Sequence, residues 1–137
     1  MTNFTKNLMI AAAALTIAVG VAGAQTMKAE IPFGFRAAGA VMPAGSYLVN
    51  ADQTAGGLTF FKLTNQDTHR SILAVPYTHI GQKPGETPVA LTFACSGAHC
   101  TLVQAAPGSG ESYRFKSPDL GKDRDTRLAV IRAVLMR

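Results

Sequence analysis

The hexapeptide CSGAHC, residues 95–100, contains the residue types with the most obvious chemistry in this chain. Cys95 and Cys100 are its only two cysteines, and His99 directly precedes the second. Thiolate and imidazole groups bind metal ions, reactive thiols exchange with other thiols, and two thiols that face each other form a structural disulfide. The segments on either side of the hexapeptide favour one of these three chemistries.

Those segments predict a β-hairpin. Residues 89–95 (VALTFAC) alternate as a strand does, and residues 100–106 (CTLVQAA) return as a second strand. The four intervening residues form the expected hairpin loop, which places Cys95 directly opposite Cys100. In this geometry the two thiols are close enough to form a disulfide.

The metal and redox hypotheses fit the hexapeptide less well. A structural metal site needs three or four ligands, and a regular strand points His99 and Cys100 to opposite faces. Catalytic thiol exchange favours two intervening residues at the start of a helix, where the helix dipole lowers the thiol pKa. We therefore predict a structural disulfide between Cys95 and Cys100, and we keep a metal site of Cys95, His99 and Cys100 as an alternative.

The amino-terminal residues have the layout of a secretory signal peptide. Lys6 supplies the positive charge, residues 8–23 carry none, and Ala22 and Ala24 occupy the small-residue positions that signal peptidase requires. The uncharged run is shorter than the about twenty residues of a membrane-spanning helix. We predict cleavage between Ala24 and Gln25.

Removal of the signal peptide, residues 1–24, leaves residues 25–137, a length that suits one domain. The sequence therefore predicts a periplasmic or extracellular protein that does not span a membrane after cleavage. An oxidising compartment also favours the disulfide. The excess positive charge lies in residues 114–137, with seven basic and three acidic side chains. We interpret this segment as a solvated surface and expect no nucleic-acid partner.

Short apolar stretches punctuated by Gly, Pro, Asn and Asp predict an all-β fold. We expect a single antiparallel β-sandwich or small barrel of about seven or eight strands. Residues 29–35 read as its first strand, and Pro32 predicts that this strand lies at an edge, because proline cannot donate to a ladder. The predicted core residues are Ile31, Phe33, Phe35, Leu91 and Phe93.

The last segment, residues 126–137, fits two kinds of element. The β-branched Val130, Ile131 and Val134 favour a strand that closes the sheet. A helix is the alternative, since Asp125 or Thr126 could cap one.

The stretch EIPFGFRAAGAVMPAGSYLV, residues 30–49, resembles the opening of a family of small secreted bacterial proteins with the pattern I-P-F-x-F, a short spacer and L-P-A-G-x-Y. Met42 stands where that family usually has Leu. The later LTF, PGSG and aromatic-strand segments extend the resemblance over most of residues 29–116. The resemblance implies an exported, β-rich protein with no established activity, and it brings no catalytic residues.

Motifs for catalysis are missing from the sequence. It contains no Gly-x-Ser-x-Gly elbow, and the GSG at residues 108–110 lacks the Lys and the following helix of a phosphate loop. His69, His79 and His99 are dispersed and lie in or beside predicted turns. We predict no catalytic residue, no resident cofactor and no metal ligand.

These observations predict an exported, non-catalytic β-domain that acts as a binding or envelope-associated module. One alternative is a carrier that holds a small apolar ligand inside a β-barrel. The other is a periplasmic metal binder that uses Cys95, His99 and Cys100.

Overall fold

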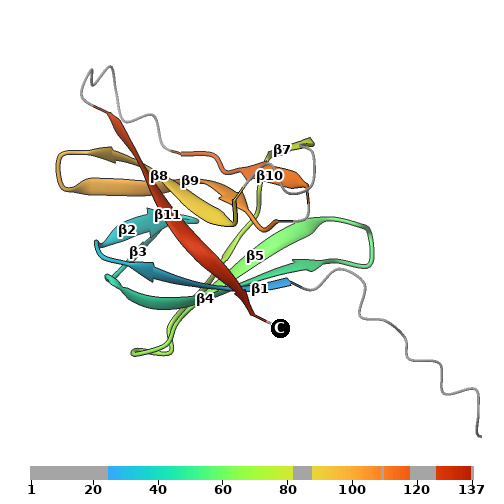
Figure 1. The fold of residues 1–137 in the computed structure, drawn as a ribbon, viewed down its shortest axis with the longest axis horizontal. Coiled ribbons are helices and arrows are strands. Elements are labelled where there is room, and N and C mark those ends of the chain that lie inside the picture. Colours follow the sequence, from blue (N-terminus) through green and yellow to red (C-terminus); the bar gives the residue numbers. More distant parts are fainter. Residues whose placement is uncertain (1–24, 82–87, 109, 118–125, 137) are drawn as a thin grey trace, which may run out of the picture.

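The protein is an all-β domain whose strands form one nearly closed, barrel-like sheet (Figure 1). The computed structural model describes residues 25–81, 88–108, 110–117 and 126–136. The predicted signal peptide lies outside these residues. Within the described stretches, no helix is long and apolar enough to cross a membrane.

Eleven strands make up the sheet. In chain order they are β1 (Gln25–Ile31), β2 (Phe35–Ala37), β3 (Ala40–Met42), β4 (Gly45–Gln53), β5 (Thr59–Asn65), β6 (Ser71–Ala74), β7 (Thr78–Gly81), β8 (Ala90–Ser96), β9 (His99–Ala106), β10 (Glu111–Arg114) and β11 (Arg127–Met136). Their spatial order is β3-β2-β9-β8-β11-β1-β4-β5-β6, and β10 pairs with both β9 and β7. All these pairs are antiparallel except β2 with β9.

The predicted all-β class is confirmed, and the sheet is barrel-like. The strand number is higher than the seven or eight expected from the sequence. Five of the strands, β2, β3, β6, β7 and β10, have only three or four residues. Such segments are too short to produce a clear alternation of apolar and polar side chains.

The carboxy-terminal segment is a strand, as predicted, and it joins two parts of the sheet (Figure 1). The first six residues of β11, Arg127–Arg132, pair with β8. Residues 133–136 pair with β1 on the other side. β11 therefore connects the β9–β8 hairpin to the β1–β4–β5 meander through backbone hydrogen bonds.

The predicted edge position of the first strand is wrong. β1 lies between β11 and β4, in the middle of the sheet. β1 ends at Ile31, so Pro32 follows the strand and its missing N–H removes no ladder bond. The proline marks the end of a central strand, and the chain turns there toward β2.

Aromatic side chains fill much of the interior. Phe93 contacts Phe33 and Phe35 edge to face, with ring centroids 5.1 Å apart in both pairs. A second group forms around Phe61, whose ring contacts Tyr113 at 5.1 Å and Phe115 at 5.5 Å. Edge-to-face contacts of this kind add stability beyond the area that the rings bury.

Most of the predicted core is confirmed. Ile31, Phe35, Leu91 and Phe93 are buried, whereas Phe33 is partly buried and packs against the core from outside it. The alternation of side chains along β8 therefore identified the inner face of that strand. The single strand predicted over residues 29–35 is wrong, because this stretch forms the end of β1, a bend at residues 32–34 and the start of β2.

Replacing Phe93 by Ala is expected to lower the free energy of unfolding by about 3–5 kcal/mol, because it leaves a cavity among packed rings. Leu128→Ala on the neighbouring strand is the matched control, since Leu128 is 69% exposed. The control is expected to change stability by less than about 0.5 kcal/mol. Urea unfolding measures both changes, and equal losses would show that the inner face is misassigned.

Candidate functional site

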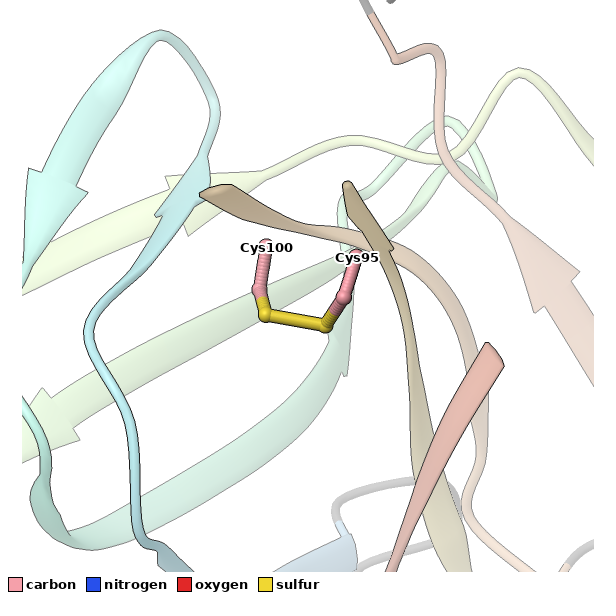
Figure 2. The surroundings of a disulfide bond; sticks show 2 residues. All are labelled: Cys95 and Cys100. Carbon is pink, nitrogen blue, oxygen red and sulfur yellow. A yellow bond between two sulfur atoms is a disulfide. The ribbon is translucent and has the colours of Figure 1, made fainter. Parts of the chain in front are cut away.

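The hexapeptide forms a tight β-hairpin between β8 and β9. Cys95 is the cross-strand partner of Cys100, and the two residues form a disulfide with their Cα atoms 4.0 Å apart (Figure 2). Ser96 pairs with His99, so the turn has two central residues where the sequence predicted a loop of four. Gly97 occupies the first of them with φ +59°, which a two-residue hairpin turn with glycine at this position requires.

The disulfide lies on the inner side of the hairpin. Cys100 is buried and Cys95 packs against the hydrophobic core, whereas His99 is exposed. Both sulfurs are used in the bond, which leaves His99 as the one side chain of the trio able to bind a metal ion. Among the described residues no group of three or more His, Cys, Asp or Glu side chains could hold a metal.

The second candidate for a functional site is a polar cleft at one end of the barrel. It consists of two adjoining hollows with volumes of about 230 and 380 Å³. The walls come from the start of β1, the β4–β5 turn and the β7–β10 pair, which gather on the right of Figure 1. Both hollows are lined by Gln53, Thr59, Glu111 and Tyr113.

Tyr113 is held at the base of this cleft by the core beneath it. Its ring packs on Phe61, and its hydroxyl donates a hydrogen bond of 2.5 Å to Oε2 of Glu111. The two residues are two positions apart on β10 and therefore share a face of the strand. His79 is the cross-strand partner of Tyr113 on β7, with the ring centroids 5.9 Å apart.

The surroundings of Tyr113 raise the pKa of its phenol above the ordinary value of 10.0. Burial is the main cause, because it disfavours the phenolate. Glu111 raises the pKa further through its hydrogen bond and its negative charge, and a hydrogen bond with Thr59 opposes the shift. Tyr113 is therefore a neutral hydrogen-bond donor at physiological pH.

The outer part of the cleft adds further polar groups and one accessible ring. Thr78, His79 and the exposed Tyr77 line the larger hollow. Gln25 lines the smaller one and is also the first residue of β1. If cleavage occurs after Ala24 as the sequence predicts, the new α-amino group belongs to a residue of this cleft.

The cleft offers a carboxylate, an imidazole, several hydroxyls, two amides and an aromatic ring. These groups donate and accept hydrogen bonds in several directions, which suits a small polar ligand. Among the described residues that line the two hollows, Glu111 is the only carboxylate.

Sequence reasoning missed this cleft because its walls come from segments far apart in the chain. Tyr113, which is buried, carries no local motif that marks a binding site. The alternation in ESYR, residues 111–114, could have added Glu111 on the same face as Tyr113. Nothing local to Gln53 or His79 indicates that either lies near that pair.

Comparisons of the chain with protein-family models, curated proteins and solved structures find no match. The resemblance of residues 30–49 to a family of secreted bacterial proteins therefore stays a hypothesis. The function has to be argued from the geometry of the described residues.

The disulfide leads to a first prediction for this site. Thiol titration of the unfolded protein, purified from the exported fraction without reductant, is expected to find no free thiol. Replacing both Cys95 and Cys100 by Ser is expected to lower the free energy of unfolding by about 2 kcal/mol, because the bond closes a very short loop. Two reactive thiols per chain together with a bound metal would contradict the structural role.

The cleft leads to a second prediction. Glu111→Gln is expected to lower the pKa of Tyr113 toward its ordinary value, since it removes a negative charge and a carboxylate acceptor beside the phenol. Tyr47 is the internal control: burial raises its pKa too, but Asn65 and Arg70 are the groups that lower it. An NMR titration of the tyrosine ring carbons measures both. A pKa of Tyr113 that stays unchanged would show that Glu111 does not act on it.

Proposed function

We propose that the chain is an exported, non-catalytic binding module of the cell envelope. In this proposal the cleft around Glu111 and Tyr113 is the ligand site, and the ligand is a small hydroxyl-rich molecule such as a sugar. The observation that carries the proposal is the hydrogen bond from Tyr113 to Glu111 on the wall of the cleft, opposite His79.

Sugar-like ligands suit this cleft for two reasons. Their neighbouring hydroxyls both donate and accept hydrogen bonds, and they pair with planar polar side chains. The Glu111 carboxylate accepts, the Gln53 amide both donates and accepts, and His79 adds the nitrogens of its imidazole ring. Their less polar ring faces stack on accessible aromatic rings, and Tyr77 is 56% exposed at the rim.

Export is supported by the signal-peptide pattern of the first residues and by the disulfide. A disulfide persists in the periplasm or outside the cell, where thiols are not kept reduced. The predicted first residue of the mature chain, Gln25, is also the first residue of β1. Cleavage there would leave all of β1 intact.

The two alternatives receive less support from the described residues. An apolar carrier needs a hollow interior, and here Phe35, Phe61 and Phe93 pack against other rings within the barrel. A metal binder through Cys95, His99 and Cys100 needs free thiolates, and both sulfurs are joined to each other.

Native mass spectrometry of the protein from the exported fraction tests the proposal. The expected mass is that of a chain that begins at Gln25 and has lost two hydrogens to the disulfide. This mass is expected to increase when N-acetylglucosamine oligomers or glucose oligomers are added, because they bind. Glu111→Gln and Tyr77→Ala are expected to weaken saccharide binding at least tenfold, because each removes a hydrogen-bonding or stacking partner. Leu128→Ala, outside the cleft, is the control.

Other outcomes of the same measurement contradict the proposal. Retention of residues 1–24 in exported protein would overturn the cleavage site. A co-purified apolar molecule would favour the carrier, and a stoichiometric metal would favour the metal binder. Saccharide binding that survives both cleft substitutions would place the site elsewhere.

A further inference from the structure

The outer face of β11 carries apolar side chains that the fold does not use. Side chains alternate along the strand, and Ala129, Ile131 and Ala133 pack against the core. The opposite face carries Leu128, Val130, Val134 and Met136, which are 69%, 58%, 70% and 49% exposed. Four exposed apolar side chains along one outer face of a strand are unusual for a water-soluble surface and indicate an interaction site. We call these four side chains, with Arg132 among them, the apolar row.

The position of β11 limits what can cover this row. Residues Arg127–Arg132 of β11 pair with β8, and residues 133–136 pair with β1. A chain that extended the sheet through backbone hydrogen bonds would lie beside β11 and would leave its outer face uncovered. A partner that covers the row therefore contacts the side chains of the row, and a flat surface can do this.

Positive charge accompanies the apolar row. Arg132 stands within it, between Val130 and Val134, and its side chain is exposed. Lys28 on β1 is exposed and is the cross-strand partner of Val134. β11 itself contains no acidic residue.

One acidic residue lies close to these cations. Glu30 projects from the same face of β1 as Lys28, and it accepts a hydrogen bond of 2.8 Å from the Ser46 hydroxyl. Among the described residues on this face, two basic groups, Arg132 and Lys28, against the one acidic group leave the surroundings of the row positive. This charge favours an anionic partner.

We propose that the outer face of β11 binds the surface of an anionic lipid bilayer. Leu128, Val130, Val134 and Met136 enter the boundary between headgroups and acyl chains, and the basic side chains contact lipid phosphates. Apolar contact combined with basic residues is the general pattern of proteins that lie on membranes without crossing them. The site is separate from the cleft and does not depend on a ligand bound there.

A second copy of this chain fits the same face less well. A two-fold contact between two such faces would bring Arg132 and Lys28 of both copies to one interface. Like charges facing each other oppose association, whereas lipid phosphates neutralise them. The charge therefore decides for the lipid surface.

Vesicle flotation with the disulfide-bonded chain starting at Gln25 tests this proposal. The protein is expected to float with vesicles of phosphatidylglycerol and phosphatidylcholine in equal parts, and to stay in solution with pure phosphatidylcholine. Binding is expected to fall as salt is raised, because salt screens the headgroup charge. Arg132→Gln is expected to weaken binding about fivefold, the effect of one basic residue near an anionic surface.

The apolar contact is tested by Val134→Glu and, at the other end of the row, by Leu128→Glu. Each is expected to weaken vesicle binding at least tenfold, since a buried acid opposes both the apolar and the electrostatic contributions. Val41→Glu on β3 is the matched control, because Val41 is 60% exposed and lies away from β11. Circular dichroism checks that each variant keeps its fold. If one of the two variants does not fold, the other still tests the apolar contact.

Three results would overturn the proposal. The first is the absence of binding to the anionic vesicles. The second is equal loss of binding in Val134→Glu and Val41→Glu, which would show a general charge effect. The third is self-association of the free protein that Val134→Glu abolishes, which would make the face a contact between copies. None of these results bears on saccharide binding in the cleft, so the two proposals fail independently.

Discussion

The backbone hydrogen bonds that β11 makes on both of its sides are the interaction on which the rest of the fold depends. On one side they reach Ala90–Cys95 of β8, and on the other they reach β1. Residues 127–132 supply the bonds to β8 and residues 133–136 the bonds to β1, so loss of β11 would leave β1 and β8 as two open edges. The described strands would then divide into the β1–β4–β5–β6 group and the strands around β8 and β9. The carboxy-terminal strand therefore closes the barrel.

The Cys95–Cys100 disulfide fixes the register that this closure needs. Because successive side chains point to opposite faces, a slip of one residue along β8 would turn Phe93 outward and disrupt the aromatic core. The β8–β9 ladder already contains one irregularity, since Thr92 pairs with Gln104 and Phe93 with Leu102. The extra residue, Val103, accepts a backbone hydrogen bond of 2.9 Å from Phe115, which ties the end of β10 to β9. The bulge thus helps to hold the strand that carries Glu111 and Tyr113 against the barrel.

Features that depend on residues close together in the sequence could be predicted from it, whereas features that depend on distant residues could not. The hairpin of the two cysteines and the inner face of β8 depend on neighbours in the chain, and alternation alone identifies them. The position of β1 depends on a partner about a hundred residues away, and Pro32 gave the wrong answer because it lies just beyond the strand. The cleft could not be predicted from local patterns, because Gln53, His79 and Tyr113 lie on segments far apart in the sequence that come together only in the folded protein.

Folding accounts for the side chains on the inner face of β11 but not for those on its outer face. Ala129, Ile131 and Ala133 face inward and pack against the core, so folding accounts for them. Large apolar side chains face outward, where they gain nothing from the core and risk aggregation. A closing strand needs β-branched residues for its backbone, but Thr would serve outside as well as Val130 and Val134 do. Folding therefore explains the inner face of β11 and leaves the outer one to an interaction beyond the chain itself.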